Sequence, residues 1–104
     1  MDFKISGRNV EVTDAIRDYA QKKTAKLPRY YDLVQEIAVV LEREDHRLYH
    51  VELIVDIEHA DPIVANSSAE DLYAAIDDTT DKAERQLTDH KEKVRNRKRS
   101  VTNQ

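Results

Sequence analysis

The chain has 104 residues, of which 39% are hydrophobic and 37% charged, with one glycine, two prolines and no cysteine. This length fits a single domain, and so few glycines and prolines argue against an all-β sandwich or barrel. The lack of cysteine excludes disulfides and thiol chemistry. No stretch approaches the roughly 20 apolar residues of a membrane span. We therefore expect a cytoplasmic protein without a membrane contact.

The net charge of -4 is distributed unevenly along the chain. Residues 1–80 hold 9 basic and 17 acidic side chains, whereas residues 81–104 hold 8 basic and 4 acidic ones. A negative total opposes nucleic acid binding, which depends on clustered lysines and arginines. The basic run at residues 91–99 supplies such a cluster, so the charge does not exclude a nucleic acid partner.

The first part of the chain predicts a strand followed by a helix. Phe3 and Ile5 alternate with polar residues, and the strand is expected to turn at Gly7. Thr13 is a suitable N-cap for a helix with an apolar stripe. Pro28 is expected to end or distort this helix.

Three strands are predicted next, over residues 36–42, 49–57 and 63–65, with a hairpin connection at 44–47. The strand at 49–57 shows the clearest alternation, with one apolar face and one acidic face. The apolar face is expected to form the core.

A long helix is predicted to begin near residues 67–71, where Ser68 and Asp71 approximate a capping box. Its apolar face continues for about six turns. The order β-α-β-β-β-α indicates an α+β fold, one four-stranded sheet with two helices packed on one face. We expect one domain over residues 1–99 and a disordered tail over residues 100–104.

Basic residues flank the apolar stripe of each predicted helix. At about 100° per residue, Lys22, Lys26 and Arg29 share one side of the first helix, with Lys23 at the core margin. On the last helix Lys82, Arg85 and Lys93 cluster similarly. If these two flanks are adjacent, they form one basic seam that suits a phosphate backbone. The alternative is that both flanks are ordinary solvated helix faces.

Two segments carry a family resemblance. The first is residues 5–16 with 23–31 (ISGRNVEVTDAI and KTAKLPRYY), and the second is residues 71–77 with 82–87 and 90–93 (DLYAAID, KAERQL and HKEK). In this order they resemble the ribosome hibernation-promoting factors, also called ribosome-associated inhibitors. The resemblance runs from about residue 1 to residue 94.

The resemblance implies a fold similar to double-stranded-RNA-binding domains, bound to the small ribosomal subunit and its ribosomal RNA. There it would block messenger RNA and tRNA in idle ribosomes. It also implies a regulator that is not an enzyme, with no metal, cofactor or small-molecule substrate, and we expect it to be monomeric off the ribosome. The cations that it implies contact RNA are Lys23, Lys26, Arg29, Lys82, Arg85 and Lys93. The charge pattern adds Lys22 and Lys91, with Arg95, Arg97, Lys98 and Arg99 as accessory residues.

Two features depart from the family pattern. Asp89 stands where the family often has a lysine, which should weaken phosphate attraction there. The family's long form also carries a C-terminal dimerisation domain that this sequence does not show. The sequence therefore resembles the short form.

Other functions stay open on the sequence alone. His46, His50 and His59 with Asp56 and Asp61 resemble a weak metal or acid–base pattern. The acidic strand face formed by Glu42, Glu52, Asp56 and Glu58 offers a protein-interaction module as the alternative function. Tyr73 fits either base stacking or packing.

Overall fold

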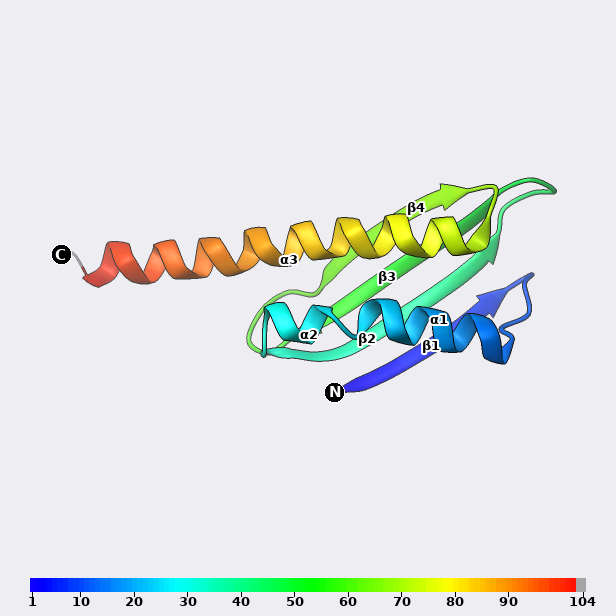
Figure 1. Ribbon diagram of the computed structural model, residues 1–104. Helices are drawn as coiled ribbons and strands as arrows, with labels where there is room; N and C mark the ends of the chain where they lie inside the picture. The colour runs from blue at the N-terminus through cyan, green and yellow to red at the C-terminus, as the bar shows by residue number, and fades with distance from the viewer. Residues whose placement is uncertain (103–104) are drawn as a thin grey trace.

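The computed structural model describes the backbone of residues 1–102 and the side chains of residues 1–97. The elements are β1 (Asp2–Arg8), α1 (Asp14–Thr24), α2 (Leu27–Tyr30), β2 (Val34–Arg43), β3 (Tyr49–Ile57), β4 (Ile63–Ala69) and α3 (Leu72–Thr102). The four strands form one sheet in the order β1-β2-β3-β4, and the helices lie on one face of it (Figure 1). The predicted α+β class and element order are confirmed.

The sheet is mixed, because β1 pairs with β2 in parallel whereas β2–β3 and β3–β4 are antiparallel pairs. A parallel pair needs a long crossover, and α1 with α2 supplies it. β1 runs past Gly7 to Arg8, and the chain turns at Asn9, whose φ is 59°. Gly7 is required here, since a Cβ at this position would lie 2.4 Å from the carbonyl oxygen of Val10.

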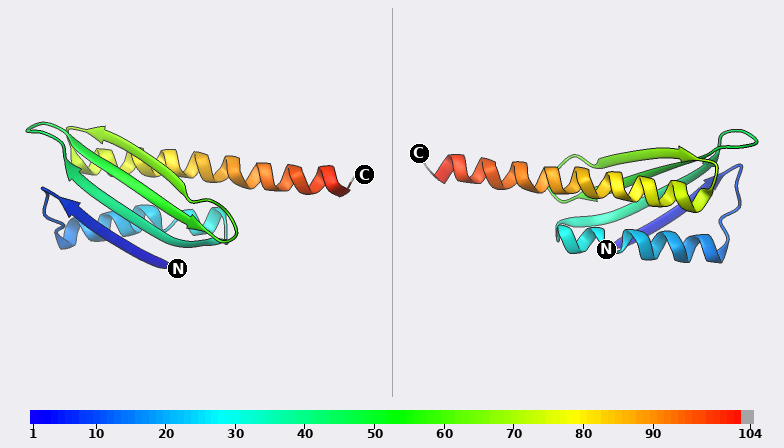
Figure 2. Two further views of the ribbon diagram at one scale, coloured as in Figure 1. Left: turned by 180° about the vertical axis from the view of Figure 1, so that it is seen from behind. Right: turned by 45° about the horizontal axis from the view of Figure 1, so that its top comes forward.

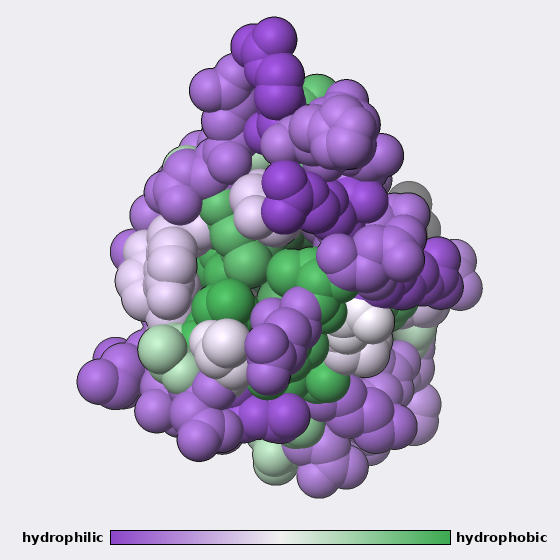
Figure 3. Space-filling view, turned by 90° about the vertical axis from the view of Figure 1, so that its right-hand side faces the viewer, coloured by the Kyte–Doolittle hydropathy of each residue, from purple (hydrophilic) through white to green (hydrophobic). Residues whose placement is uncertain are grey.

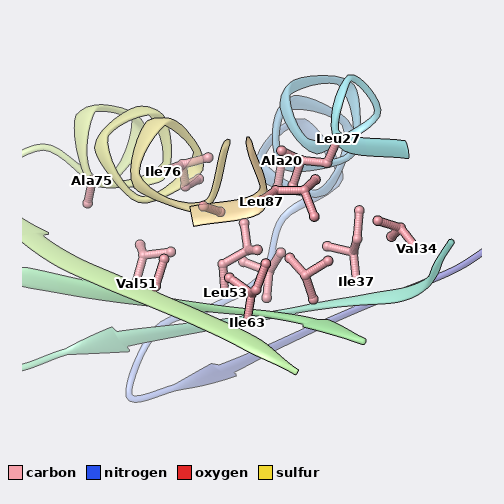
Figure 4. Packing of buried hydrophobic residues seen from close by; sticks show 14 of the residues in the cluster. Ala20, Leu27, Val34, Ile37, Val51, Leu53, Ile63, Ala75, Ile76 and Leu87 are labelled. Atoms are coloured by element: carbon pink, nitrogen blue, oxygen red, sulfur yellow. The ribbon is translucent and has the colours of Figure 1, made fainter. Parts of the chain in front are cut away.

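The core lies between the sheet and the helices (Figure 4). Alternate residues of β2 and β3 point into it, as the pattern of their sequences predicts. Leu53 and Val55 of β3 meet Ile76 and Leu87 of α3 in the same buried cluster. The other face of the sheet carries no helix, as the view from behind shows (Figure 2).

Two boundaries differ from the prediction. The first helix ends at Thr24, and Pro28 lies in the first turn of the short α2, where a missing N–H costs nothing. β4 runs to Ala69, so the expected helix start at Ser68 is wrong. The N-cap of α3 is Asp71, whose carboxylate accepts the backbone N–H of Ala74 at 3.3 Å.

The molecule is elongated, 57 × 23 × 17 Å, because α3 extends beyond the sheet (Figures 1 and 2). Its last residues, 103–104, and the side chains of 98–102 lie outside the described part. The expected domain over 1–99 and tail over 100–104 therefore stay predictions.

The opposite end of the molecule, which we call the hairpin end, holds the β2–β3 connection at residues 44–48 and the start of both long helices. Viewed from this end, apolar residues are visible within a rim of hydrophilic ones (Figure 3). Val10, Val12 and Ile16 are partly buried and pack against the core.

Candidate nucleic-acid interface

The two long helices run side by side and in the same direction, away from the hairpin end (Figures 1 and 2). Successive residues along the first helix therefore contact successive residues along α3. Tyr19 of α1 meets Tyr73 of α3, Lys23 meets Asp77, and the next turn brings Lys26 to Glu84.

Lys23 and Lys26 are not free cations, because carboxylates of α3 pair with both. The Lys26 ammonium lies 3.0 Å from Glu84 and 3.7 Å from Asp81. The Lys23 ammonium lies 3.4 Å from Asp77. The line between α1 and α3 is therefore a ladder of ion pairs, which we call the interhelix ladder.

The strongest pair of the ladder changes the titration of both its partners. The hydrogen bond to Glu84 raises the pKa of Lys26 above its ordinary value, although partial burial opposes this. The same hydrogen bond lowers the pKa of Glu84 below its ordinary value. Each charge therefore stabilises the other, and at neutral pH the pair is fully ionised.

Tyr19 joins the ladder through a hydrogen bond that the sequence analysis missed. Its hydroxyl donates to Asp77 at 2.6 Å, and this bond raises the pKa of Tyr19 to about 12. The ring of Tyr73 contacts Tyr19 edge to face, with centroids 4.9 Å apart. Tyr73 thus packs against α1 while 37% of it stays exposed. These contacts depend on the parallel packing of α1 and α3, which the sequence pattern does not predict.

Among the described side chains, Lys82 and Arg85 form no ion pair of the ladder, although Arg85 lines hollows with its members Asp81 and Glu84. Lys82 is about 200° around α3 from Glu84, and its ammonium donates to the carbonyl oxygen of Asn66 in β4 at 3.0 Å. Arg85 and Ser67 line the same hollow. Carboxylates of α3 therefore interrupt the predicted seam of lysines and arginines, and the RNA contacts of these cations stay a prediction.

Further cations follow one another along α1, α2 and the projecting part of α3. The Lys91 ammonium donates to the carbonyl oxygen of Tyr30 at 3.0 Å, which fixes α2 against α3. We call this region the basic pole. Its described members are Lys22, Lys26, Arg29, Lys91, Lys93, Arg95 and Arg97. All except Lys26 are exposed.

Some predicted residues fall outside the basic pole or outside the described side chains. Lys23 belongs to the interhelix ladder, and Lys82 and Arg85 lie on turns of α3 nearer the hairpin end than Lys91. The side chains of Lys98 and Arg99 are outside the described part. Asp89 lines a hollow with Arg85 and Glu84, so the sequence departure does place a negative charge next to a candidate cation.

The geometry offers little support for a metal or catalytic site. In the described part of the chain, no three His, Asp or Glu side chains are placed to hold a metal ion. The Nδ1 atom of His50 lies 2.9 Å from the hydroxyl of Ser68 and 3.2 Å from Glu44, while Ser68 donates to Glu44. The Ser68 proton is thus directed to the carboxylate. These contacts join the hairpin to β4.

Comparison with known proteins shows the family of the chain. A family model described as "Sigma 54 modulation protein / S30EA ribosomal protein" matches residues 3–95. The chain belongs to this family. The match includes α1, α2, α3 as far as residue 95 and all of the basic pole except Arg97, and the resemblance seen in the sequence is confirmed.

Relatives of similar length carry a functional name. The ribosome hibernation promoting factor of Azotobacter vinelandii is 41% identical over 93 residues, covering 89% of this chain and 85% of that protein. The factor of the same name from Escherichia coli strain K12 is 39% identical over 95 residues, covering 91% and 98%.

Solved structures agree on the fold. The crystal structure of the Thermus thermophilus Protein Y N-terminal domain has a TM-score of 0.77 and 39% identity, covering 86% of this chain and 99% of that one. A ribosomal subunit interface protein from Coxiella burnetii has a TM-score of 0.80, covering 88% and 98%. Its identity of 23% supports the fold alone. In the described residues, no helix is both long and apolar enough to cross a bilayer.

Proposed function

We propose that this chain is a ribosome hibernation factor that binds ribosomal RNA of the small subunit in the decoding groove. From that position it blocks messenger RNA and tRNA and so inhibits translation in idle ribosomes. The observation that carries this proposal is the family match over residues 3–95, which includes α1, α2 and most of the basic pole.

The chemistry of the basic pole suits a phosphate backbone. Long cationic side chains at helical spacing contact phosphates without reading bases. The family resemblance also selects Lys23, Lys82 and Arg85, which lie outside the basic pole, and we retain them as secondary contacts. Lys23 and Lys26 must exchange a carboxylate for a phosphate to take part, which lowers their contribution.

The proposed function implies a cellular location and binding partners. A factor that acts on ribosomes works in the cytoplasm, with the small subunit and its RNA as partners. The recognition of phosphate by side chains needs no metal, cofactor or small-molecule substrate, and we propose that the protein is monomeric off the ribosome and has no enzymatic role.

Charge reversal at the two ends of the molecule tests this proposal. The variant Lys22→Glu, Arg29→Glu changes the basic pole, whereas Arg17→Glu, Arg47→Glu makes the same change in net charge near the hairpin end. Each variant is checked for folding by circular dichroism and then sedimented with purified small subunits in a sucrose gradient.

The pole variant should lose most of its binding and its inhibition of translation in a cell-free system, while the hairpin-end variant keeps both. Equal loss in the two variants would show that only net charge matters. Full binding by the pole variant would contradict the proposed interface.

A further inference from the structure

The face of the sheet opposite the helices is uncovered, and it differs chemically from the basic pole. On this face, which we call the open sheet face, residues alternate with the buried core residues of β2 and β3. It has no covering helix (Figure 2). The proposed function uses the helices and leaves this surface without a role.

An apolar band crosses the middle of the open sheet face. Ala38 of β2 is in register with Ile54 of β3, and Ile54 with Val64 of β4. Val40 lies on the same side of β2, two residues along. Val64 is 45% exposed, one of few large apolar residues exposed to this degree in the described chain. The band thus offers apolar area to a partner.

Carboxylates border the apolar band. Glu36 stands directly opposite Asp56 in the β2–β3 register, and Glu52 stands opposite Val40. Like charges directly opposite each other destabilise a sheet, and a cation near Asp56 would add to the relief that Lys4 already gives at Glu36.

The face already accepts one ammonium group. Lys4 of β1 lies 3.0 Å from Glu36, with 71% of its own side chain exposed. Among the side chains that the structure describes, no cation pairs with Glu52 or Asp56. The rim therefore keeps negative charge for a partner.

We propose that the open sheet face is a docking surface for an extended protein segment rich in lysine and arginine that also carries aliphatic side chains. Charge complementarity selects this occupant, since the carboxylates attract cations and repel the phosphates of RNA. An extended segment places alternate side chains on one side, so its aliphatic residues meet the apolar band and its cations reach the rim. This role is separate from RNA binding by the helices.

A synthetic peptide of alternating lysine and valine is the probe, with fluorescence anisotropy as the measurement and the whole chain as the receptor. A peptide of alternating lysine and serine has the same charge without the aliphatic groups. Amide chemical shifts of the isotope-labelled protein report which face the peptide occupies. Sedimentation of the protein alone reports self-association.

The lysine–valine peptide should bind, shift amides of β2, β3 and β4, and bind more tightly than the lysine–serine peptide. Glu36→Gln, Asp56→Asn should weaken it on the order of tenfold. The matched control Asp78→Asn, Asp89→Asn removes two exposed carboxylates of α3 and should change affinity little. Ile54→Ser, Val64→Ser should remove the preference for valine.

Several outcomes would overturn the proposal. They are no binding of the lysine–valine peptide, shifts confined to α1 and α3, or equal losses in the sheet variant and its control. Self-association that the Glu36→Gln, Asp56→Asn variant abolishes would identify a second copy as the occupant instead. A single-stranded RNA that shifts the same strand amides would likewise replace the basic segment. RNA binding by the basic pole is measured separately and survives any of these results.

Discussion

Two lysines of the helical surface have two possible partners. The lysines proposed to contact RNA phosphates also pair with carboxylates of α3. Lys26 pairs with Glu84, and Lys23 shares Asp77 with Tyr19. Part-exposed ion pairs of this kind contribute about 0 to 1 kcal/mol to stability. A phosphate can therefore replace the carboxylate partner of Lys23 or Lys26 at a small cost in free energy.

Glu84→Gln should free Lys26 for phosphate and raise the affinity for a small-subunit RNA fragment by about two- to fivefold, in line with one such pair. Asp78→Asn, which removes the same charge from an exposed position near the start of α3 and far from the basic pole, is the control and should have a smaller effect. Anisotropy of labelled RNA measures both. If the two variants gain equally, the pairing with Lys26 does not limit RNA binding.

Tyr19 should ionise late. Its hydrogen bond to Asp77 raises its pKa to about 12, against about 10 in an unfolded chain. A raised pKa means that the bond stabilises the fold fully below pH 10 and that this stability is lost between about pH 10 and 12. The tyrosinate absorbance of wild type minus that of Tyr19→Phe should rise near pH 12 in the folded protein and near pH 10 in urea. A folded midpoint near pH 10 would contradict the bond.

Among the elements, α3 divides into a packed part and a projecting part. Its first turns carry Ile76 and Leu87 into the core, whereas residues from Arg95 onward extend past the sheet (Figure 1). The family match also stops at residue 95. The two parts should therefore contribute differently to stability and binding.

Removal of residues 95–104 should leave the melting temperature nearly unchanged, because residues 95–97, the part whose side chains the structure describes, are exposed, while RNA affinity falls. Each lost phosphate contact reduces the slope of log affinity against log salt by roughly 0.7 to 0.9. Calorimetry and salt titrations measure the two effects. A large loss of melting temperature with an unchanged salt slope would assign this segment to folding instead.

Local patterns in the sequence predicted most of the elements. The alternation in residues 49–57 predicted β3, and the long apolar stripe predicted α3. The parallel β1–β2 pairing and the order of residues between α1 and α3 depend on how the elements pack, which periodicity does not report. For that reason the pairing of Lys23 with Asp77 and of Lys26 with Glu84 across the two helices was not predicted.

The same limit applies to the candidate site. Composition located the basic run at residues 91–99, and helical spacing grouped Lys22, Lys26 and Arg29. The structure joins α2 to the basic run through the hydrogen bond from Lys91 to Tyr30, 61 residues apart in sequence. That long-range contact, which no local pattern shows, defines the basic pole.

As a whole, the molecule is electrically two-sided despite its net charge of -4. Cations gather at the basic pole, and carboxylates border the open sheet face and the start of α3. Such a distribution orients a protein as it approaches a polyanion, because one side is attracted while the other is repelled. A net negative protein can therefore bind RNA in one orientation.

Lysine acetylation, measured by mass spectrometry with and without bound small subunits, tests this orientation most directly. Lys22, Lys91 and Lys93 should react several-fold more slowly in the complex, because their ammonium groups contact phosphates. Lys4 on the open sheet face reports the other side of the molecule. Unchanged rates at the basic pole together with protection of Lys4 would contradict the account.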